Sequence, residues 1–148
     1  MNSIQIIVGS MLGGTEYVAE ACQEALEAMS KEVTIHFQPN LSEINAENQL
    51  WLVCTSTHGA GDYPDNIKPF IESLTNSDQD LSTTRFLTIG VGDSSYDTFC
   101  LAAKNIEKLL LSKGCKKITE PLLLDMQQDI DPEELASDWI TNLKDQIS

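Results

Sequence analysis

Basic residues are scarce in this sequence. Nine Lys and Arg stand against 23 Asp and Glu over 148 residues, which gives a formal net charge of -14. Such an excess of negative charge repels both a phosphate backbone and anionic lipid headgroups. Nucleic acid and membranes are therefore not expected as partners. The charge is compatible with a simple solubility role and equally with steering toward a basic partner protein.

The sequence also lacks the features of export, membrane insertion and metal binding. No basic segment followed by a long apolar stretch stands at the amino terminus, and no apolar run approaches the roughly 20 residues that span a bilayer. The four cysteines show no Cys-x-x-Cys spacing, and two histidines are available to complete a metal site. We expect a soluble, cytoplasmic protein with reduced cysteines and with neither a metal nor an iron–sulfur cluster.

Two common nucleotide-binding motifs are missing as well. The first glycine-rich segment, residues 9–15, has no Gly-Lys-Ser/Thr ending and no Gly-x-Gly-x-x-Gly, which argues against a nucleoside triphosphate or a dinucleotide. A response-regulator receiver is also disfavoured. It needs acidic residues after the first strand and a phosphorylatable Asp after the third, where this chain has Gly9-Ser10 and Thr55-Ser56.

What the sequence does contain is a regular alternation of strand and helix patterns. Short apolar, β-rich runs predict strands at 4–8, 33–37, 50–55, 85–91 and 118–124. The last is assigned to a sheet edge, because Pro121 removes a hydrogen-bond donor. Apolar spacing of three to four residues predicts helices at 15–29, 66–74, 97–112 and 131–147, with Thr15 and Asp131 as N-caps. The polar connection at 39–49 has room for one helical turn.

These elements predict one α/β domain that spans residues 1–148. Apolar strands that alternate with helices imply a parallel sheet covered on both faces. A doubly wound three-layer sandwich fits best, with a five-stranded parallel sheet in the order 2-1-3-4-5. In such sheets, ligands bind outside the carboxyl ends of the strands, where the winding reverses. The loops after the first, third and fourth strands are therefore the candidate site.

The residues of these three loops suit a ligand with a phosphate and a flat ring. The loop at 9–15 joins a buried strand to a helix N-terminus, where amides and the helix dipole attract an anion, and a phosphate monoester fits it best. In the loop at 56–66, Gly59 and Gly61 let the backbone approach a flat ligand. His58 or Tyr63 could lie against its ring. The loop at 90–100 places Tyr96 just before a helix.

The second and third loops also resemble a known family. Gly-x-Gly-Asp-Ser-Ser-Tyr-x-x-Phe-Cys, preceded by Ser-Thr-x-Gly-x-Gly-Asp-x-Pro-Asp-Asn, is similar to the FMN-binding domains of diflavin reductases such as the sulfite reductase flavoprotein. The likeness covers the whole chain, and its single-domain length resembles that of short-chain flavodoxins. The resemblance implies a flavodoxin-like fold with FMN as the cofactor.

By this resemblance, FMN-binding residues can be assigned in each loop. The first loop would hold the phosphate, and the other two would lie on opposite sides of the isoalloxazine ring. Tyr96 would be the stacking ring, and Gly59 matches the position whose backbone bonds the flavin. The assigned residues are Ser10, Met11, Leu12, Gly13, Gly14, Thr15, Ser56, Thr57, His58, Gly59, Ala60, Gly61, Val91, Gly92, Asp93, Ser94, Tyr96, Phe99 and Cys100. We expect no catalytic residue and no metal ligand.

Two of these positions depart from the family pattern. Relatives usually carry a third hydroxyl where Leu12 stands, so one phosphate hydrogen bond would be missing. Several relatives place a tyrosine against the flavin where His58 stands. We therefore expect FMN to bind more weakly than in a typical flavodoxin.

The resemblance implies an electron carrier rather than an enzyme with its own substrate site. The sequence contains no nicotinamide-binding region, so single electrons would come from a separate NAD(P)H-dependent flavodoxin or ferredoxin reductase. Iron–sulfur enzymes, including those of the radical-SAM type, would be acceptors. We expect the protein to be a monomer. The alternative is a regulatory or protein-interaction module that keeps the fold with weak or no flavin binding.

Overall fold

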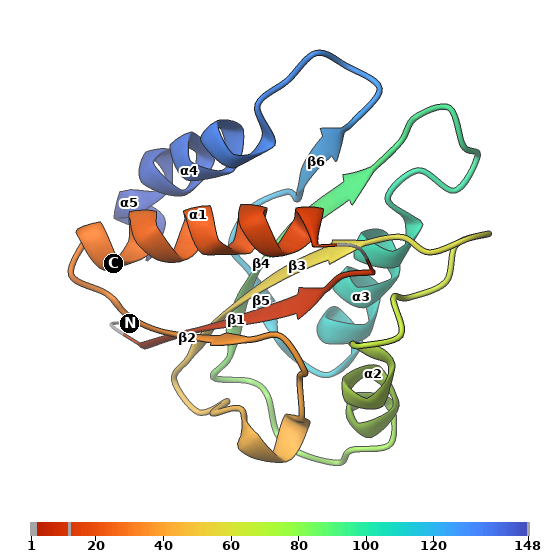
Figure 1. The fold of residues 1–148 in the computed structure, drawn as a ribbon. Coiled ribbons are helices and arrows are strands. Elements are labelled where there is room, and N and C mark those ends of the chain that lie inside the picture. Colours follow the sequence, from red (N-terminus) through yellow and green to blue (C-terminus); the bar gives the residue numbers. More distant parts are fainter. Residues whose placement is uncertain (1–2, 12, 148) are drawn as a thin grey trace.

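A parallel β-sheet runs through the middle of the molecule (Figure 1). The computed structural model describes residues 3–11 and 13–147. Its strands are β1 (Ser3–Gly9), β2 (Glu32–His36), β3 (Leu50–Ser56), β4 (Arg85–Gly92), β5 (Lys116–Lys117) and β6 (Leu122–Asp125). The order β2-β1-β3-β4-β5 confirms the predicted 2-1-3-4-5, and the paired strands are parallel.

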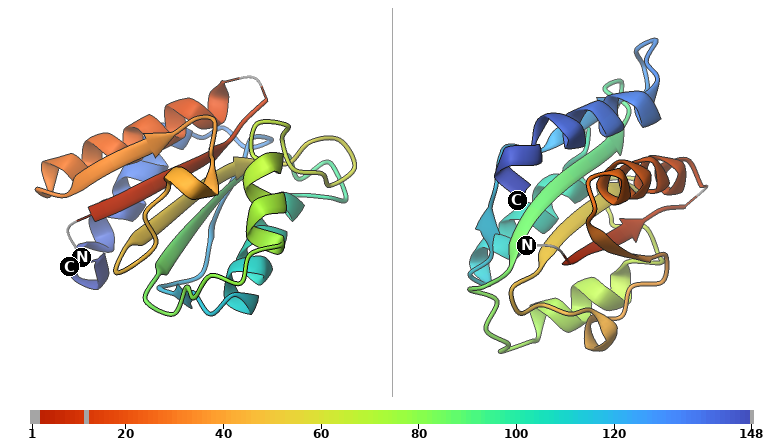
Figure 2. Two further views of the ribbon diagram at one scale, coloured as in Figure 1. Left: turned by 90° about the horizontal axis from the view of Figure 1, so that it is seen from below. Right: turned by 90° about the vertical axis from the view of Figure 1, so that its left-hand side faces the viewer.

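Helices cover both faces of this sheet. α1 (Gly14–Ala28), α4 (Pro132–Asn142) and α5 (Lys144–Ile147) lie on one face (Figures 1 and 2). α2 (Lys68–Thr75) and α3 (Leu101–Ser112) lie on the other. A 3-10 turn, η1 (Leu41–Glu43), supplies the helical turn predicted between the second and third strands. The doubly wound three-layer sandwich is thus confirmed.

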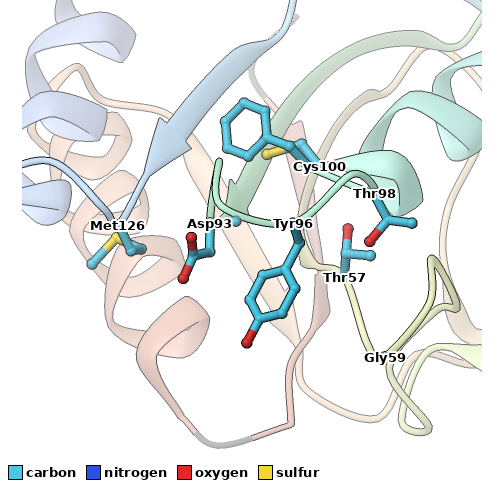
Figure 3. A pocket seen from close by; sticks show the side chains of 9 residues that line it. Thr57, Gly59, Asp93, Tyr96, Thr98, Cys100 and Met126 are labelled. Atoms are coloured by element: carbon cyan, nitrogen blue, oxygen red, sulfur yellow. The ribbon is translucent and has the colours of Figure 1, made fainter.

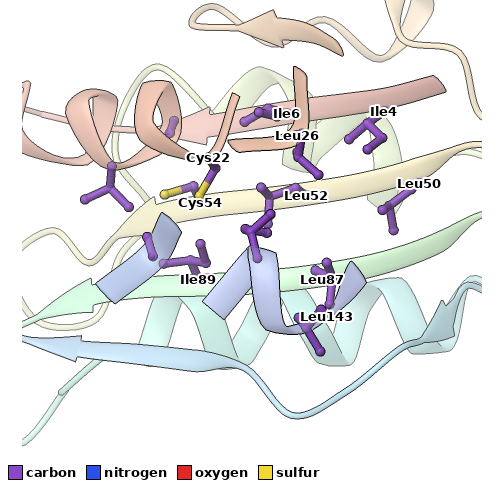
Figure 4. Packing of buried hydrophobic residues seen from close by; sticks show 14 of the residues in the cluster. Ile4, Ile6, Cys22, Leu26, Leu50, Leu52, Cys54, Leu87, Ile89 and Leu143 are labelled. Carbon is purple, nitrogen blue, oxygen red and sulfur yellow. The ribbon is translucent and has the colours of Figure 1, made fainter. Parts of the chain in front are cut away.

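Alternation along the central strands gives each face its own apolar core. In β1, Ile4 and Ile6 pack toward α1 and α4, while Ile7 packs toward α2 and α3. Figure 4 shows the first of these cores, with side chains of β1, β3 and β4 meeting those of α1 and the C-terminal helices. In the second core, Trp51 meets Phe70 edge to face at 5.9 Å between ring centroids. The central strands are buried on both sides and form a rigid base for the loops at their ends.

The outermost strand differs from the expectation. We predicted one strand over 118–124, whereas the structure has two segments, β5 before Pro121 and β6 after it, and both pair with β4. Proline has no N–H to donate, so the ladder is interrupted there. The predicted edge position is confirmed.

Two helix starts also differ from the prediction. Gly13, and not Thr15, is the N-cap of α1, because its left-handed backbone (φ 93°) turns the chain into the helix. Thr15 is buried in the first turn instead. α3 begins at Leu101 rather than near residue 97, because Cys100 is left-handed (φ 52°) and turns precede it. The terminal helix is divided near Leu143 into α4 and α5, whereas its predicted N-cap at Asp131 is confirmed by a hydrogen bond.

The four cysteines are free and buried. Burial raises the pKa of the Cys22 thiol to about 12 and the pKa of Cys54 well above its ordinary value. Burial also raises the pKa of Cys115 to about 11. These thiols are therefore neutral packing groups at physiological pH.

Among the helices of the described residues, none combines the length and the apolar character needed to cross a membrane.

Candidate functional site

Two adjoining hollows form a cleft at the carboxyl ends of the central strands. The larger hollow, about 530 Å³, lies where β1 and β3 end and α4 begins. The smaller hollow, about 380 Å³, lies among the loops that follow β3, β4 and β6. Thr57 and Met126 line both, so the two hollows are neighbours. Each volume falls within the range of small-molecule sites.

The larger hollow offers the groups that an anion needs. Ser10, Gly14 and Thr15 line it at the junction of β1 and α1. The Ser10 hydroxyl accepts a hydrogen bond from the backbone N–H of Gly13 at 3.1 Å, which leaves its own hydrogen for donation. The first-turn amides and the dipole of α1 add positive potential at the same end. This part of the cleft suits a phosphate group.

Asn66 holds the first loop in place. Its Oδ1 accepts the backbone N–H of Ser10 at 2.8 Å, and its Nδ2 donates to the carbonyls of Val8 (2.7 Å) and Phe37 (2.9 Å). Three segments that are distant in the sequence are therefore joined by one side chain. The loop that lines the larger hollow is thereby fixed to the sheet.

The second loop forms a small hairpin beside the smaller hollow. His58 and Asp62 exchange two backbone hydrogen bonds, each 2.8 Å long, with Gly59 and Ala60 at the exposed tip. Gly59 is left-handed (φ 53°), and among the described residues no atom beyond Gly59 and its two chain neighbours lies within 4 Å of the place where a Cβ would be. Its backbone is open for a flat ligand to approach. At the base of the hairpin, the Thr57 hydroxyl accepts the N–H of Ala102 at 3.0 Å, which ties this loop to α3.

The third loop provides an aromatic ring. Tyr96 is 66% exposed and lines the smaller hollow, and Figure 3 shows its side chain between Asp93 and Thr57. Cys100 lines the same hollow and is buried. Burial raises the pKa of the Cys100 thiol to about 11, so this residue is neutral and not a nucleophile. A Cβ on Gly92 would come within 2.9 Å of its sulfur, and only glycine fits beside it.

Hydrogen bonds keep two carboxylates ionised, one that lines the cleft and one beside it. Asp93 accepts the hydroxyl and the backbone N–H of Ser95, at 2.6 and 2.9 Å, and these bonds hold its pKa below the ordinary value of 3.8. Asp125, at the end of β6, accepts the N–H of Ser94 at 3.0 Å, which lowers its pKa in the same way. Negative charge therefore borders the smaller hollow.

The structure brings most of the predicted residues to the cleft. Those that line it are Ser10, Met11, Gly14, Thr15, Ser56, Thr57, His58, Gly59, Val91, Gly92, Asp93, Tyr96, Phe99 and Cys100.

Four predicted residues do not line either hollow. Gly13 caps α1, Ala60 lies at the hairpin tip, Gly61 packs on Leu101, and Ser94 donates to Asp125. Leu12 lies outside the described residues. Tyr63 is half-buried against the core beneath α2 and α3, and burial raises its pKa.

One side of the cleft, formed by residues after β6 and at the start of α4, was not predicted from the sequence. Met126, just after β6, lines both hollows, and Pro132 and Glu133 at the start of α4 line the larger one. Val18 was also not predicted, and Thr98 lies within the predicted third loop but was not among its assigned residues. The segment after β6 contains neither glycine nor an aromatic residue. The available signal was its position, since it follows a parallel strand at the same edge of the sheet as the other loops.

Comparison with known proteins decides the family. The sequence profile of the Flavodoxin family matches residues 6–139. This chain belongs to the flavodoxin family. It is 47% identical over 137 residues to a MioC homolog from Haemophilus influenzae, covering 93% of each chain, and 43% identical over 140 residues to MioC from Escherichia coli K12, covering 95% of each. A mutant of a flavodoxin from Pseudomonas aeruginosa superposes with a TM-score of 0.90 at 30% identity over 98% of both chains.

Family membership confirms the resemblance seen in the sequence and indicates the class of ligand that suits the cleft. Flavodoxins are electron carriers rather than enzymes, and they bind a flavin, usually FMN. The residues of this cleft fit such a group. Hydroxyls and helix amides stand where a phosphate needs donors, and the open backbone of Gly59 and the ring of Tyr96 stand where a flat ring needs contact.

Proposed function

We propose that this flavodoxin binds FMN in the cleft and passes single electrons from a separate NAD(P)H-dependent flavodoxin or ferredoxin reductase to acceptor enzymes. The observation that carries the proposal is that the two hollows adjoin at Thr57 and Met126, one suited to a phosphate and the other to a flat ring. When bound, the flavin supplies the redox chemistry, while the protein supplies binding, orientation and electrostatics.

Each of the three predicted loops would hold a different part of FMN. Ser10, Gly14 and Thr15 would hold the phosphate at the N-terminus of α1. Tyr96 would stack on the ring, and the backbone of Gly59 would donate or accept a hydrogen bond at the ring edge. The hydrogen bond from Ala102 to Thr57 ties the hairpin to the first turn of α3, the helix that follows the third loop.

The charges around the cleft set how readily electrons are accepted. Asp93 lines the smaller hollow as a carboxylate, Asp125 lies beside it through its hydrogen bond with Ser94, and Glu133 lines the larger hollow. A unit negative charge about 10 Å away opposes an added electron by about 0.4 kcal/mol in water, and by more where water is excluded. The acidic surroundings therefore lower the reduction potential.

The partners follow from the resemblance and from the charge. A net charge of -14 favours encounter with basic surfaces on a reductase or an acceptor. Iron–sulfur enzymes, including those of the radical-SAM type, are the acceptor class that we propose, with this protein acting as a monomer.

A titration with FMN tests the proposal. Bound-flavin absorption bands and quenched flavin fluorescence should appear as FMN is added to the purified protein. The dissociation constant should exceed that of flavodoxins with a full hydroxyl set, because of Leu12 and His58. A reductase and NADPH should then reduce the bound flavin, and candidate acceptors should reoxidise it. Absence of binding at millimolar FMN would favour the regulatory module instead.

A further inference from the structure

Met126 belongs to the cleft although no motif in the sequence points to it. Its side chain lines both hollows, as that of Thr57 does. It is 47% exposed, so apolar surface is left open at the cleft. In Figure 3, Met126 and Thr57 lie on opposite sides of Asp93 and Tyr96. A ligand with one end in each hollow must pass the part of the cleft that these two residues line.

Hydrogen bonds hold the segment around Met126 against the third loop. The N–H of Met126 donates to the carbonyl of Gly92 at 2.8 Å. This bond continues the pairing of β6 with β4 by one residue beyond the end of the strand. The backbone of Met126 is therefore fixed relative to β4.

Asp125 and Gln127 complete this attachment on both sides of Met126. The Asp125 carboxylate accepts the N–H of Ser94 and that of Gln127, both at 3.0 Å. The Gln127 side-chain amide donates to Asp93 Oδ2 at 3.0 Å. The segment at 125–127 is thus a fourth strand-end loop that is built onto the third, and it presents Met126 to the cleft.

We propose that Met126 contacts the bound cofactor where the two hollows join, with Asp125 as the residue that positions it. The inference rests on the proposed function, because it takes FMN as the ligand. The thioether side chain is unbranched and polarisable, which allows it to follow the shape of a ribityl chain and the adjoining ring edge. The site is then made of four strand-end loops rather than three.

Oxidation of methionine by hydrogen peroxide tests the contact in the unmodified protein. The rate at each methionine is measured by mass spectrometry in the dark, with and without saturating FMN. FMN should slow the oxidation of Met126 at least about fivefold, since a covered thioether is shielded from the oxidant. Met29, which packs against the core at the far end of α1, should react at an unchanged rate. Equal oxidation rates of Met126 in the presence and in the absence of FMN would overturn the proposal.

Variants test the energetic side of the contact. Met126→Ala should raise the dissociation constant of FMN by about five- to tenfold, because apolar area buried by the ligand is lost, while Met126→Leu should stay within about twofold. Leu111→Ala is the matched control, since Leu111 is 46% exposed and does not line the cleft. An unchanged constant for Met126→Ala would refute the contact.

Asp125→Ala separates positioning from general stability. In the FMN-saturated variant, Met126 should regain much of its reactivity toward peroxide, whereas the oxidation of Met29 and the urea midpoint should change little. Retained protection of Met126 would refute the positioning role. If the wild-type protein does not quench FMN fluorescence at all, the proposed function fails, and that result is distinct from failure of the Met126 contact.

Discussion

Tyr96 and Tyr17 are similarly exposed, at 66% and 64%, but their surroundings differ. Tyr96 lines the smaller hollow, whereas Tyr17 lies on α1 outside both hollows. An aromatic ring open to water beside a hollow is suited to stacking on a flat ligand. The pair therefore allows a comparison in which exposure is constant and location varies.

Removal of the Tyr96 ring should weaken FMN binding. Stacking of a flat base on an aromatic side chain contributes about 1–3 kcal/mol, so Tyr96→Ala should raise the dissociation constant of FMN by about 5- to 150-fold. Tyr96→Phe should bind nearly as the wild type does. Fluorescence titration measures both, with Tyr17→Ala as the control that should bind normally. An unchanged constant for Tyr96→Ala would exclude the stacking role.

Glu133 should oppose the binding of the phosphate. Its side chain lines the same hollow as Ser10 and Thr15, so its carboxylate faces a group of like charge. Glu133→Gln should tighten FMN binding about two- to fourfold at low ionic strength, the effect of one unit charge about 10 Å from a phosphate, and the gain should fade in salt. Glu134→Gln is the control, because Glu134 does not line that hollow. Riboflavin, which has no phosphate, should bind both variants equally.

Asn66 acts at the scale of elements, because it joins the ends of β1 and β2 to the segment that leads into α2. Asn66→Ala leaves the Ser10 N–H and two carbonyls without this partner, and it should lower the free energy of unfolding by about 1–3 kcal/mol. Asn76→Ala, at the exposed end of α2, should change it by less than about 0.5 kcal/mol. Urea unfolding measures both. Equal midpoints for the two variants would show that Asn66 does not brace the loop.

The arrangement of the elements was largely predictable, because apolar periodicity reports directly on burial. The residues at which the helices begin were less predictable. Thr15 has the side chain of an N-cap, yet the left-handed conformation of Gly13 decides where α1 begins. Cys100 adopts a left-handed conformation that its residue type does not favour, so the late start of α3 has no signal in the sequence.

The site was predictable where a motif carried it and not elsewhere. Gly59 and Tyr96 belong to long motifs that resemble a family, and both line the smaller hollow. Met126 and Glu133 come from a segment of ordinary composition. They reach the cleft because β6 ends there and α4 begins there. Such residues are found from the fold and not from their type.

Charge is unevenly distributed over the whole molecule. Helices α1 and α4 carry seven carboxylates and no Lys or Arg, namely Glu16, Glu20, Glu24, Glu27, Glu133, Glu134 and Asp138. Five of the nine basic residues lie between the start of α3 and β5, namely Lys104, Lys108, Lys113, Lys116 and Lys117. The molecule therefore has an electric dipole across the sheet, which would orient it toward a basic surface such as that of the proposed reductase.

Electron exchange with a reductase should depend on this asymmetry. Glu20→Lys on α1 and Asp78→Lys in the connection before β4 change the net charge equally. The first should slow reduction several-fold more than the second below about 0.1 M salt, where the Debye length exceeds about 10 Å. Stopped-flow rates at increasing ionic strength measure this, and the variants should converge at high salt. Equal rates at low salt would show that net charge alone matters.

The interruption at Pro121 has a consequence for self-association. An exposed sheet edge offers unpaired amides and carbonyls to the edge of another molecule. Here that edge consists of a two-residue strand of lysines and a four-residue strand, separated by residues 118–121, of which Pro121 has no amide hydrogen. The positive charge of the exposed Lys116 would repel a second copy that aligned there, whereas Lys117 is ion-paired with Glu107 and Glu120. The proline that shortens the outermost strand therefore also protects the sheet from edge-to-edge aggregation.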